Sequence, residues 1–127
     1  MKISDIIFSG DLSPDLFNTI AKEKAISVGS NYKPASRQSQ LRKFYDELCM
    51  WEVRVNQQPE RFDELLPFIR MMNAKAVYAR GRGHVNDEFT QLLSHCLEQI
   101  KSPNTLRICK TFMEAFMGFY KVHGPKD

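Results

Sequence analysis

Apolar residues recur every three or four positions along most of the chain, which is the spacing of amphipathic α-helices. Alternation typical of strands is nearly absent. The pattern predicts five helices, over about residues 14–28, 36–56, 60–80, 86–100 and 103–123. With short connections between them, they predict an all-α fold, a small single-domain helical bundle.

Residues typical of helix ends set the expected boundaries. Ser13 and Pro14 favour a first helix with Ser13 as its N-cap, and Asn86 favours the start of the fourth. Ser102 and Pro103 start the fifth helix, which Gly124 and Pro125 end. Pro67 interrupts the third apolar stripe and should kink the helix or start a new one, because proline lacks a backbone N–H.

The last predicted helix has more apolar surface than one core face requires, between Phe112 and Tyr120. An apolar surface wider than one stripe indicates burial on two sides. Two explanations stay open, namely a central helix of the bundle or a contact with another subunit.

Length and composition favour one globular domain. The chain has 127 residues, of which 43% are hydrophobic and 26% charged. No stretch approaches the roughly 20 apolar residues of a membrane span, and Asp5 precedes any apolar run, unlike a signal peptide. We therefore expect a cytoplasmic protein that does not bind membranes.

The three cysteines predict neither disulfides nor a metal site. Cys49, Cys96 and Cys109 are an odd number without paired spacing, and His95 next to Cys96 lacks a second pair of ligands. No cofactor is expected.

No catalytic motif is present, so an enzyme is not expected. There is no nucleophile elbow, phosphate-binding glycine loop or His-Glu-x-x-His. The neighbouring acids Asp46-Glu47 and Asp63-Glu64 do not share a helix face. His84, in a predicted turn, is interpreted as a solvated histidine rather than a phosphate ligand.

Charge alternates in blocks along the chain, although the net charge is only +3. Residues 32–45 and 70–84 each carry four bases and no acid, whereas residues 46–69 carry six acids against two arginines. Such blocks give separate basic and acidic faces. A basic face is suited to a phosphate backbone, but solvated helix faces with local ion pairs would give the same pattern.

Four motifs occur in order along the chain. They are Gln40-Leu41-Arg42-Lys43-Phe44-Tyr45, then Glu64-Leu65-Leu66-Pro67-x-Ile69-x-Met71, then Ala74-Lys75-Ala76-x-Tyr78-Ala79-x-Gly81-Arg82, and finally Phe112-x-Glu114-Ala115-Phe116 followed by Tyr120-Lys121 and Gly124. In these motifs the sequence resembles the small helical subunit of the type III-A CRISPR effector complex, the Csm-type small subunit. The resemblance covers residues 32–124, which form a family-like core after a variable N-terminal part, residues 1–31.

The resemblance implies a non-catalytic subunit of an RNA-guided antiviral defence complex. Several copies would stack head to tail beside the backbone subunits that hold the guide RNA, and the stack would touch the large subunit. It would line the channel in which single-stranded target RNA pairs with the guide. It would contact mainly the sugar-phosphate backbone, since base pairing already supplies specificity.

From these implications we predict the RNA-binding residues. The principal candidates are Arg42, Lys43, Lys75, Arg80 and Arg82. The secondary candidates are Lys33, Arg37, Arg70 and Lys121.

Two other functions are weighed against this one. The first is a helical protein-interaction module that forms a homodimer through residues 112–120 and binds no nucleic acid. The second is a helix-turn-helix DNA-binding protein, which is disfavoured because no two short helices joined by a tight glycine turn are evident.

Overall fold

Helices follow one another with short connections throughout the computed structural model, which describes residues 1–30 and 35–126. The described part contains no strand, so the all-α prediction is confirmed. A π-helical turn, Leu16–Ile20, leads into α1, and a 3-10 turn, Pro59–Arg61, precedes α3. The helices are α1 (Ala21–Gly29), α2 (Gln38–Gln57), α3 (Phe62–Arg70), α4 (Met72–Gly81), α5 (Asp87–Glu98) and α6 (Pro103–His123).

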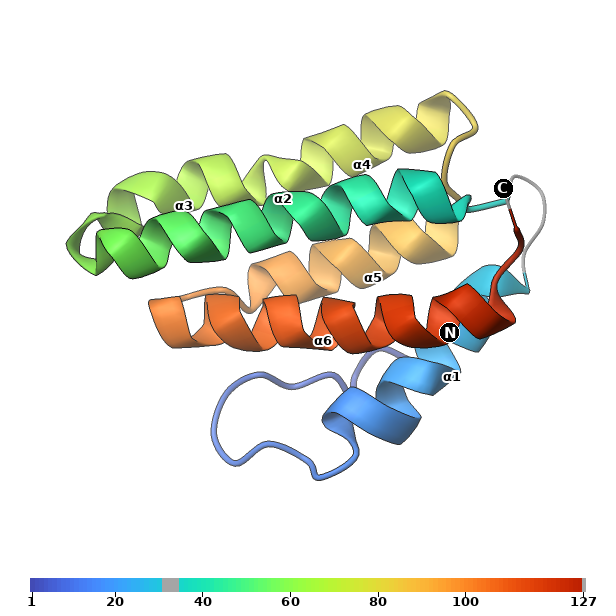
Figure 1. The fold of residues 1–127 in the computed structure, drawn as a ribbon, viewed down its shortest axis with the longest axis horizontal. Helices are drawn as coiled ribbons and strands as arrows, with labels where there is room; N and C mark the ends of the chain where they lie inside the picture. Colours follow the sequence, from blue (N-terminus) through green and yellow to red (C-terminus); the bar gives the residue numbers. More distant parts are fainter. Residues whose placement is uncertain (31–34, 127) are drawn as a thin grey trace.

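From α2 onward the chain runs back and forth along the long axis of the molecule (Figure 1). Helices α3 and α4 together form one return pass, α5 runs back, and α6 returns again. Consequently α2 begins at the end of the molecule where α4 and α6 end, on the right of Figure 1.

Helix α6 lies at the centre and packs most extensively against α1 and α2. Phe112, Phe116 and Tyr120 are completely buried within this one chain. Burial on two sides therefore reflects a central helix rather than a subunit contact. The same observation removes these three side chains from the homodimer face that the sequence left open.

Proline divides the third predicted helix in two, as expected. Pro67 lies inside α3, which ends at Arg70, and α4 starts at Met72. Because Pro67 donates no hydrogen bond to the preceding turn, the helix is weakened there, and the two segments meet at Met71.

The starts of α5 and α6 confirm two predicted caps. The Asn86 side chain accepts a hydrogen bond from the Phe89 N–H at 3.0 Å. Ser102 and Thr105 form a capping box at the start of α6, with Pro103 in its first turn. Both caps satisfy backbone donors that a helix start leaves without partners.

The start of the first helix was predicted wrongly. Regular α-helix begins only at Ala21, after the π-helical turn, and Ser13 caps no α-helix. The Ser13 hydroxyl instead accepts a hydrogen bond from the Asp15 N–H at 3.2 Å, and the Ile20 N–H bonds to the Asp15 carbonyl at 3.0 Å. That five-residue bond widens the turn, so helical periodicity starts later than the Ser-Pro signal implied.

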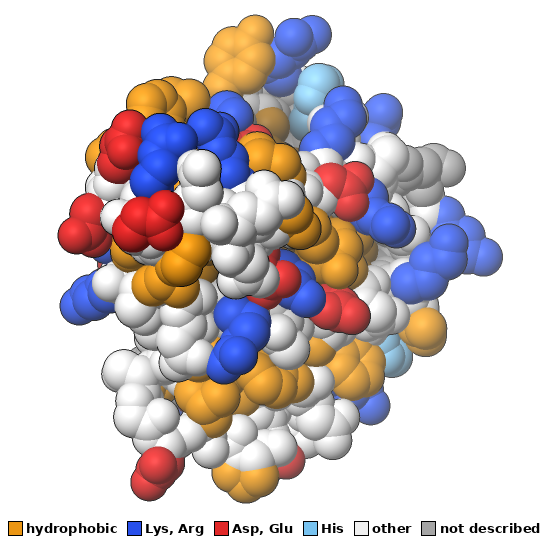
Figure 2. Space-filling model, turned by 60° about the vertical axis from the view of Figure 1, so that its left-hand side comes forward, with side chains coloured by type: hydrophobic (Ala, Val, Ile, Leu, Met, Phe, Trp, Pro, Cys, Tyr) orange, Lys and Arg blue, Asp and Glu red, His pale blue; other side chains and the backbone are white. Residues whose placement is uncertain are grey.

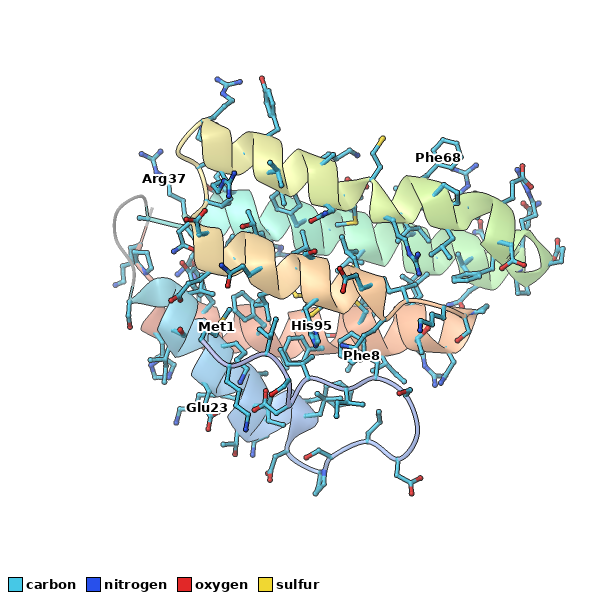
Figure 3. The ribbon with its side chains drawn as sticks, turned by 180° about the vertical axis from the view of Figure 1, so that it is seen from behind. Met1, Phe8, Glu23, Arg37, Phe68 and His95 are labelled. Atoms are coloured by element: carbon cyan, nitrogen blue, oxygen red, sulfur yellow. The ribbon has the colours of Figure 1, made fainter. Side chains whose placement is uncertain are left out.

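The first residues of the chain pack against α5 and α6, which the sequence did not reveal. Ile6 and Phe8 are buried, and Phe8 stacks at a tilt on Phe112 with ring centroids 5.9 Å apart. Gln99 accepts from the Phe8 N–H at 2.8 Å and donates to the Ile6 carbonyl at 2.7 Å, and His95 reaches the same carbonyl (Figure 3). Residues 5–8 thus complete the core.

The two helical ends that meet at Gly29 and Gly124 allow a stability prediction. A Cβ at Gly29 would lie 2.9 Å from the Gly124 Cα, whereas a Cβ at Gly118, in the middle of α6, would meet nothing within 4 Å. We expect Gly29→Ala to lower the free energy of unfolding by about 1–3 kcal/mol through overpacking. Gly118→Ala, the matched change, should raise it by about 0.5–1 kcal/mol.

Urea unfolding followed by circular dichroism measures both changes. Equal midpoints for the two variants would contradict the close approach of α1 to the end of α6.

Candidate nucleic-acid interface

Basic residues from three distant segments come together at one end of the bundle. The back-and-forth course of the chain places the start of α2, the end of α4 and the end of α6 at the same end of the long axis (Figure 1). We call this region the basic end. Its members are Arg37, Arg42, Lys43, Arg80, Arg82, Lys121 and Lys126.

The surface reflects this distribution. Figure 2 brings the opposite end of the molecule forward, and there acidic and basic side chains lie among each other. Toward the right of that view, Lys and Arg side chains outnumber the acids. A gathering of cations at one end creates a local positive potential that the small net charge conceals.

A buried polar network centred on Ser36 joins the segments of the basic end. The Ser36 hydroxyl accepts from the Asn86 N–H at 2.8 Å, and the Ser36 carbonyl accepts from the Tyr120 hydroxyl. Asn86 also donates to the Val28 carbonyl at 3.0 Å. Gln38, at the start of α2, donates to the Tyr120 carbonyl at 3.3 Å. The ends of α1 and α6 and the starts of α2 and α5 are therefore held together.

Three of the predicted RNA-binding residues have partners inside the molecule. Lys75 contacts Glu47 at 3.0 Å, and that carboxylate also accepts from the Trp51 indole at 3.0 Å. Arg70 donates to the Ile100 carbonyl at 3.0 Å, just beyond the end of α5. Each of these contacts joins two helical segments, which indicates a structural contribution.

Arg80 and Arg42 have weaker partners. Arg80 contacts Asp87 at 3.0 Å and Arg42 contacts Asp46 at 3.3 Å, and all four side chains are largely exposed. Exposed ion pairs contribute about 0–1 kcal/mol. Either arginine can therefore exchange its carboxylate for a phosphate at small cost.

The remaining predicted cations within the described residues have no ion-pair partner there. Arg37, Lys43, Arg82 and Lys121 are all exposed. Figure 3 shows Arg37 pointing away from the bundle. Lys33, the last of the predicted set, lies outside the described residues.

Two of the basic residues line a groove of about 940 Å³ between α2 and α6, together with a lysine that the sequence analysis missed. Arg42 comes from α2, Lys121 from α6, and Lys126 from the chain beyond α6. The other lining residues are Gln38, Ser39, Tyr45, Glu114, Met117 and Gly118.

The groove is positively charged despite containing one acid. Glu114 contacts Lys110 at 3.3 Å, and Lys110 also lies 3.8 Å from Glu52 of α2. Its charge is thus compensated outside the groove, and the three groove cations remain available to an anion.

Comparison with protein families matches residues 14–126, most of the chain, to the family described as Csm2 Type III-A. The chain belongs to the Csm2 Type III-A family. It is a small subunit of a type III-A CRISPR complex, and the family is one of non-catalytic structural subunits. Comparisons with curated proteins and with solved structures gave no match.

Csm2 membership agrees with the predicted resemblance, and the match begins at residue 14, upstream of the region that carries the four motifs. The division into a variable part, residues 1–31, and a family-like core stays a prediction.

Other chemistry has little support in this Csm2 chain. Among the described residues no group of three His, Cys, Asp or Glu side chains is placed to hold a metal ion. Within the same residues, no helix has the length and apolar character needed to cross a membrane. Burial and the neighbouring Cys109 raise the pKa of the Cys96 thiol well above its ordinary value, so it stays protonated.

Lys126 was missed because helical periodicity stops at Gly124. Periodicity assigns faces only within a helix, and the last residues follow the Gly-Pro terminator. The only available signal was the basic character of the C-terminal segment.

Asn86 is the position at which the polar network is most open to test. Asn86→Ala removes the cap of α5 and leaves the Val28 carbonyl without this donor. We expect the free energy of unfolding to fall by about 2–3 kcal/mol. Asn73→Ala, an exposed site within α4, should change it by less than about 0.5 kcal/mol.

Chemical denaturation of both variants checks this prediction. A loss no larger for Asn86→Ala than for Asn73→Ala would contradict the structural importance of the network.

Proposed function

We propose that this subunit holds target RNA by its sugar-phosphate backbone as the RNA pairs with the guide. The observation that supports the proposal is the convergence of cations from α2, α4 and α6 at the basic end. Arginine and lysine bind phosphate without regard to sequence. Such binding suits a complex in which base pairing with the guide already selects the target.

The proposed contacts are graded by their intramolecular partners. Arg37, Arg42, Lys43, Arg82 and Lys121 are available to phosphate, and Arg80 becomes available when it leaves Asp87. Arg70 and Lys75 are held by contacts between helices, so they stay weaker candidates. Lys33 stays a candidate from sequence alone. No catalytic step is required of this chain.

We also propose that several copies stack head to tail along the guide-target channel, next to the backbone and large subunits of a cytoplasmic complex. Head-to-tail contact is heterologous and needs complementary patches on different surfaces of one molecule. The exposed acids Glu60 and Asp63 lie near the end of α2, at the opposite end of the bundle from the basic end (Figure 1). A row of copies would also share the RNA affinity, so each copy needs only weak binding.

Neutralising two cations of the basic end tests RNA contact. In the assembled complex, Arg42→Gln combined with Arg82→Gln should weaken target binding about equally for every matched guide and target. Since each lost phosphate contact releases fewer counterions, the salt dependence should decrease by about one unit of slope per contact. Filter binding across a salt series measures both effects.

A matched control uses the opposite ends of α2 and α6. Arg54→Gln combined with Arg107→Gln removes the same charge from exposed sites near the end of α2 and the start of α6. This variant should bind nearly as wild type. Equal losses in the two double variants, or a loss confined to particular sequences, would contradict the proposal.

Charge reversal tests stacking. Glu60→Lys combined with Asp63→Lys should lower the number of copies incorporated per complex, because the acidic patch would then repel the basic end of its neighbour. Native mass spectrometry counts the copies. The control, Asp11→Lys with Asp15→Lys, changes two exposed acids of the N-terminal segment and should leave the count unchanged. An undiminished count in the first variant would refute this mode of stacking.

A further inference from the structure

The groove between α2 and α6 contains an aromatic ring that phosphate binding alone does not use. Tyr45 is half-buried, and the Arg42 guanidinium lies over its ring, 5.9 Å from the centroid. The ring and the guanidinium together form a flat π surface. Nucleic-acid bases stack on such surfaces irrespective of sequence, because every base has a π face.

The opposite wall of the groove is formed by α6 and has an open stretch. Met117 lies half-buried beside Gly118, and a Cβ at Gly118 would meet no atom within 4 Å. The missing side chain leaves room beside the backbone of α6. With a volume of about 940 Å³, the groove is at the upper end of the range of small-ligand sites.

Charge and apolar surface therefore occur together in one concave site. Lys121 and Lys126 line the same groove as Tyr45 and Met117. A free phosphate would use the lysines only, and a duplex would present its phosphates but keep its bases stacked inside. A ligand that uses every wall carries a phosphate and an exposed flat ring.

The Tyr45 hydroxyl adds no negative charge to this site. A hydrogen bond with Cys49 and partial burial raise the pKa of Tyr45 to about 12. The phenol is thus neutral at physiological pH, and it does not repel a phosphate held nearby.

We propose that the groove between α2 and α6 binds one unpaired nucleotide of single-stranded RNA, with the base against Tyr45 and Met117 and the phosphate at Lys121 and Lys126. The inference rests on the proposed RNA-binding function and extends it, because it makes the subunit sensitive to whether a nucleotide is paired. Arg42 then has two contacts, the Tyr45 ring and the incoming ligand.

The test compares two oligomers of equal charge. The full-length protein is titrated at low salt with fluorescently labelled hexauridine and with the matching abasic ribose-phosphate hexamer. Wild type should prefer hexauridine about tenfold, because stacking on an aromatic ring depends on the base. Tyr45→Leu should bind both oligomers with the abasic affinity, whereas Tyr45→Phe should retain the preference.

The chain supplies a matched control in a second Arg-Tyr pair. Arg82 lies over the Tyr78 ring at the same 5.9 Å, but Tyr78 is 68% exposed and lines no part of the groove. Tyr78→Leu should therefore keep the preference for hexauridine. Identical circular dichroism spectra and melting curves show that each variant is folded.

Several outcomes would overturn the inference. They are equal binding of both oligomers by wild type, no binding of either, an undiminished preference in Tyr45→Leu, or displacement of hexauridine by a hexaglutamate peptide at equal concentration. None of them decides the proposed function, since backbone contact is tested separately in the assembled complex with Arg42→Gln and Arg82→Gln. Conversely, failure of that test together with a Tyr45-dependent preference would identify a subunit that binds single strands only.

Discussion

The arrangement of the basic end depends on the buried hydrogen bonds around Ser36. A buried polar group without a partner costs more than a surface ion pair contributes, so the four helical ends that meet there are strongly constrained. Ser36 itself is fully buried, and it is bonded to both Asn86 and Tyr120. Because these partners start α5 and lie near the end of α6, small shifts of either helix would break the network. The exposed cations are thus carried on a rigid frame, although their own side chains remain free to move.

Rigidity of the frame matters because like charges repel. Placing cations from three segments at one end is unfavourable by itself, and the exposed pairs Arg42–Asp46 and Arg80–Asp87 reduce that cost in the free protein. The same pairs are weak enough to be exchanged for phosphate. By contrast, Lys75 is held by Glu47, which is itself bonded to Trp51, so its charge stabilises the contact between α2 and α4.

Local signals in the sequence were sufficient for the features that neighbouring residues decide. The caps at Asn86 and Ser102 and the division near Pro67 involve residues within a few positions of each other, so their physics is visible in the chain itself. Packing of Ile6 and Phe8 under α5 was not predictable, because it depends on Gln99, some ninety residues away. For the same reason charge blocks located the cations but not their partners. Arg70 matched the pattern of a solvent-facing base, yet its hydrogen bond to the Ile100 carbonyl appears only in three dimensions.

The two Arg-Tyr pairs show why residue type alone does not define a site. Arg42–Tyr45 and Arg82–Tyr78 have the same separation, and both lie at the basic end. Only the first belongs to a concavity, because α6 runs beside that part of α2 and contributes Met117, Gly118 and Lys121. Water competes fully for a base on the exposed Tyr78 ring but less for one in the groove, where two walls exclude solvent. Position next to α6 therefore distinguishes a ligand site from an ordinary surface contact, and that position follows from the network that fixes the end of α6.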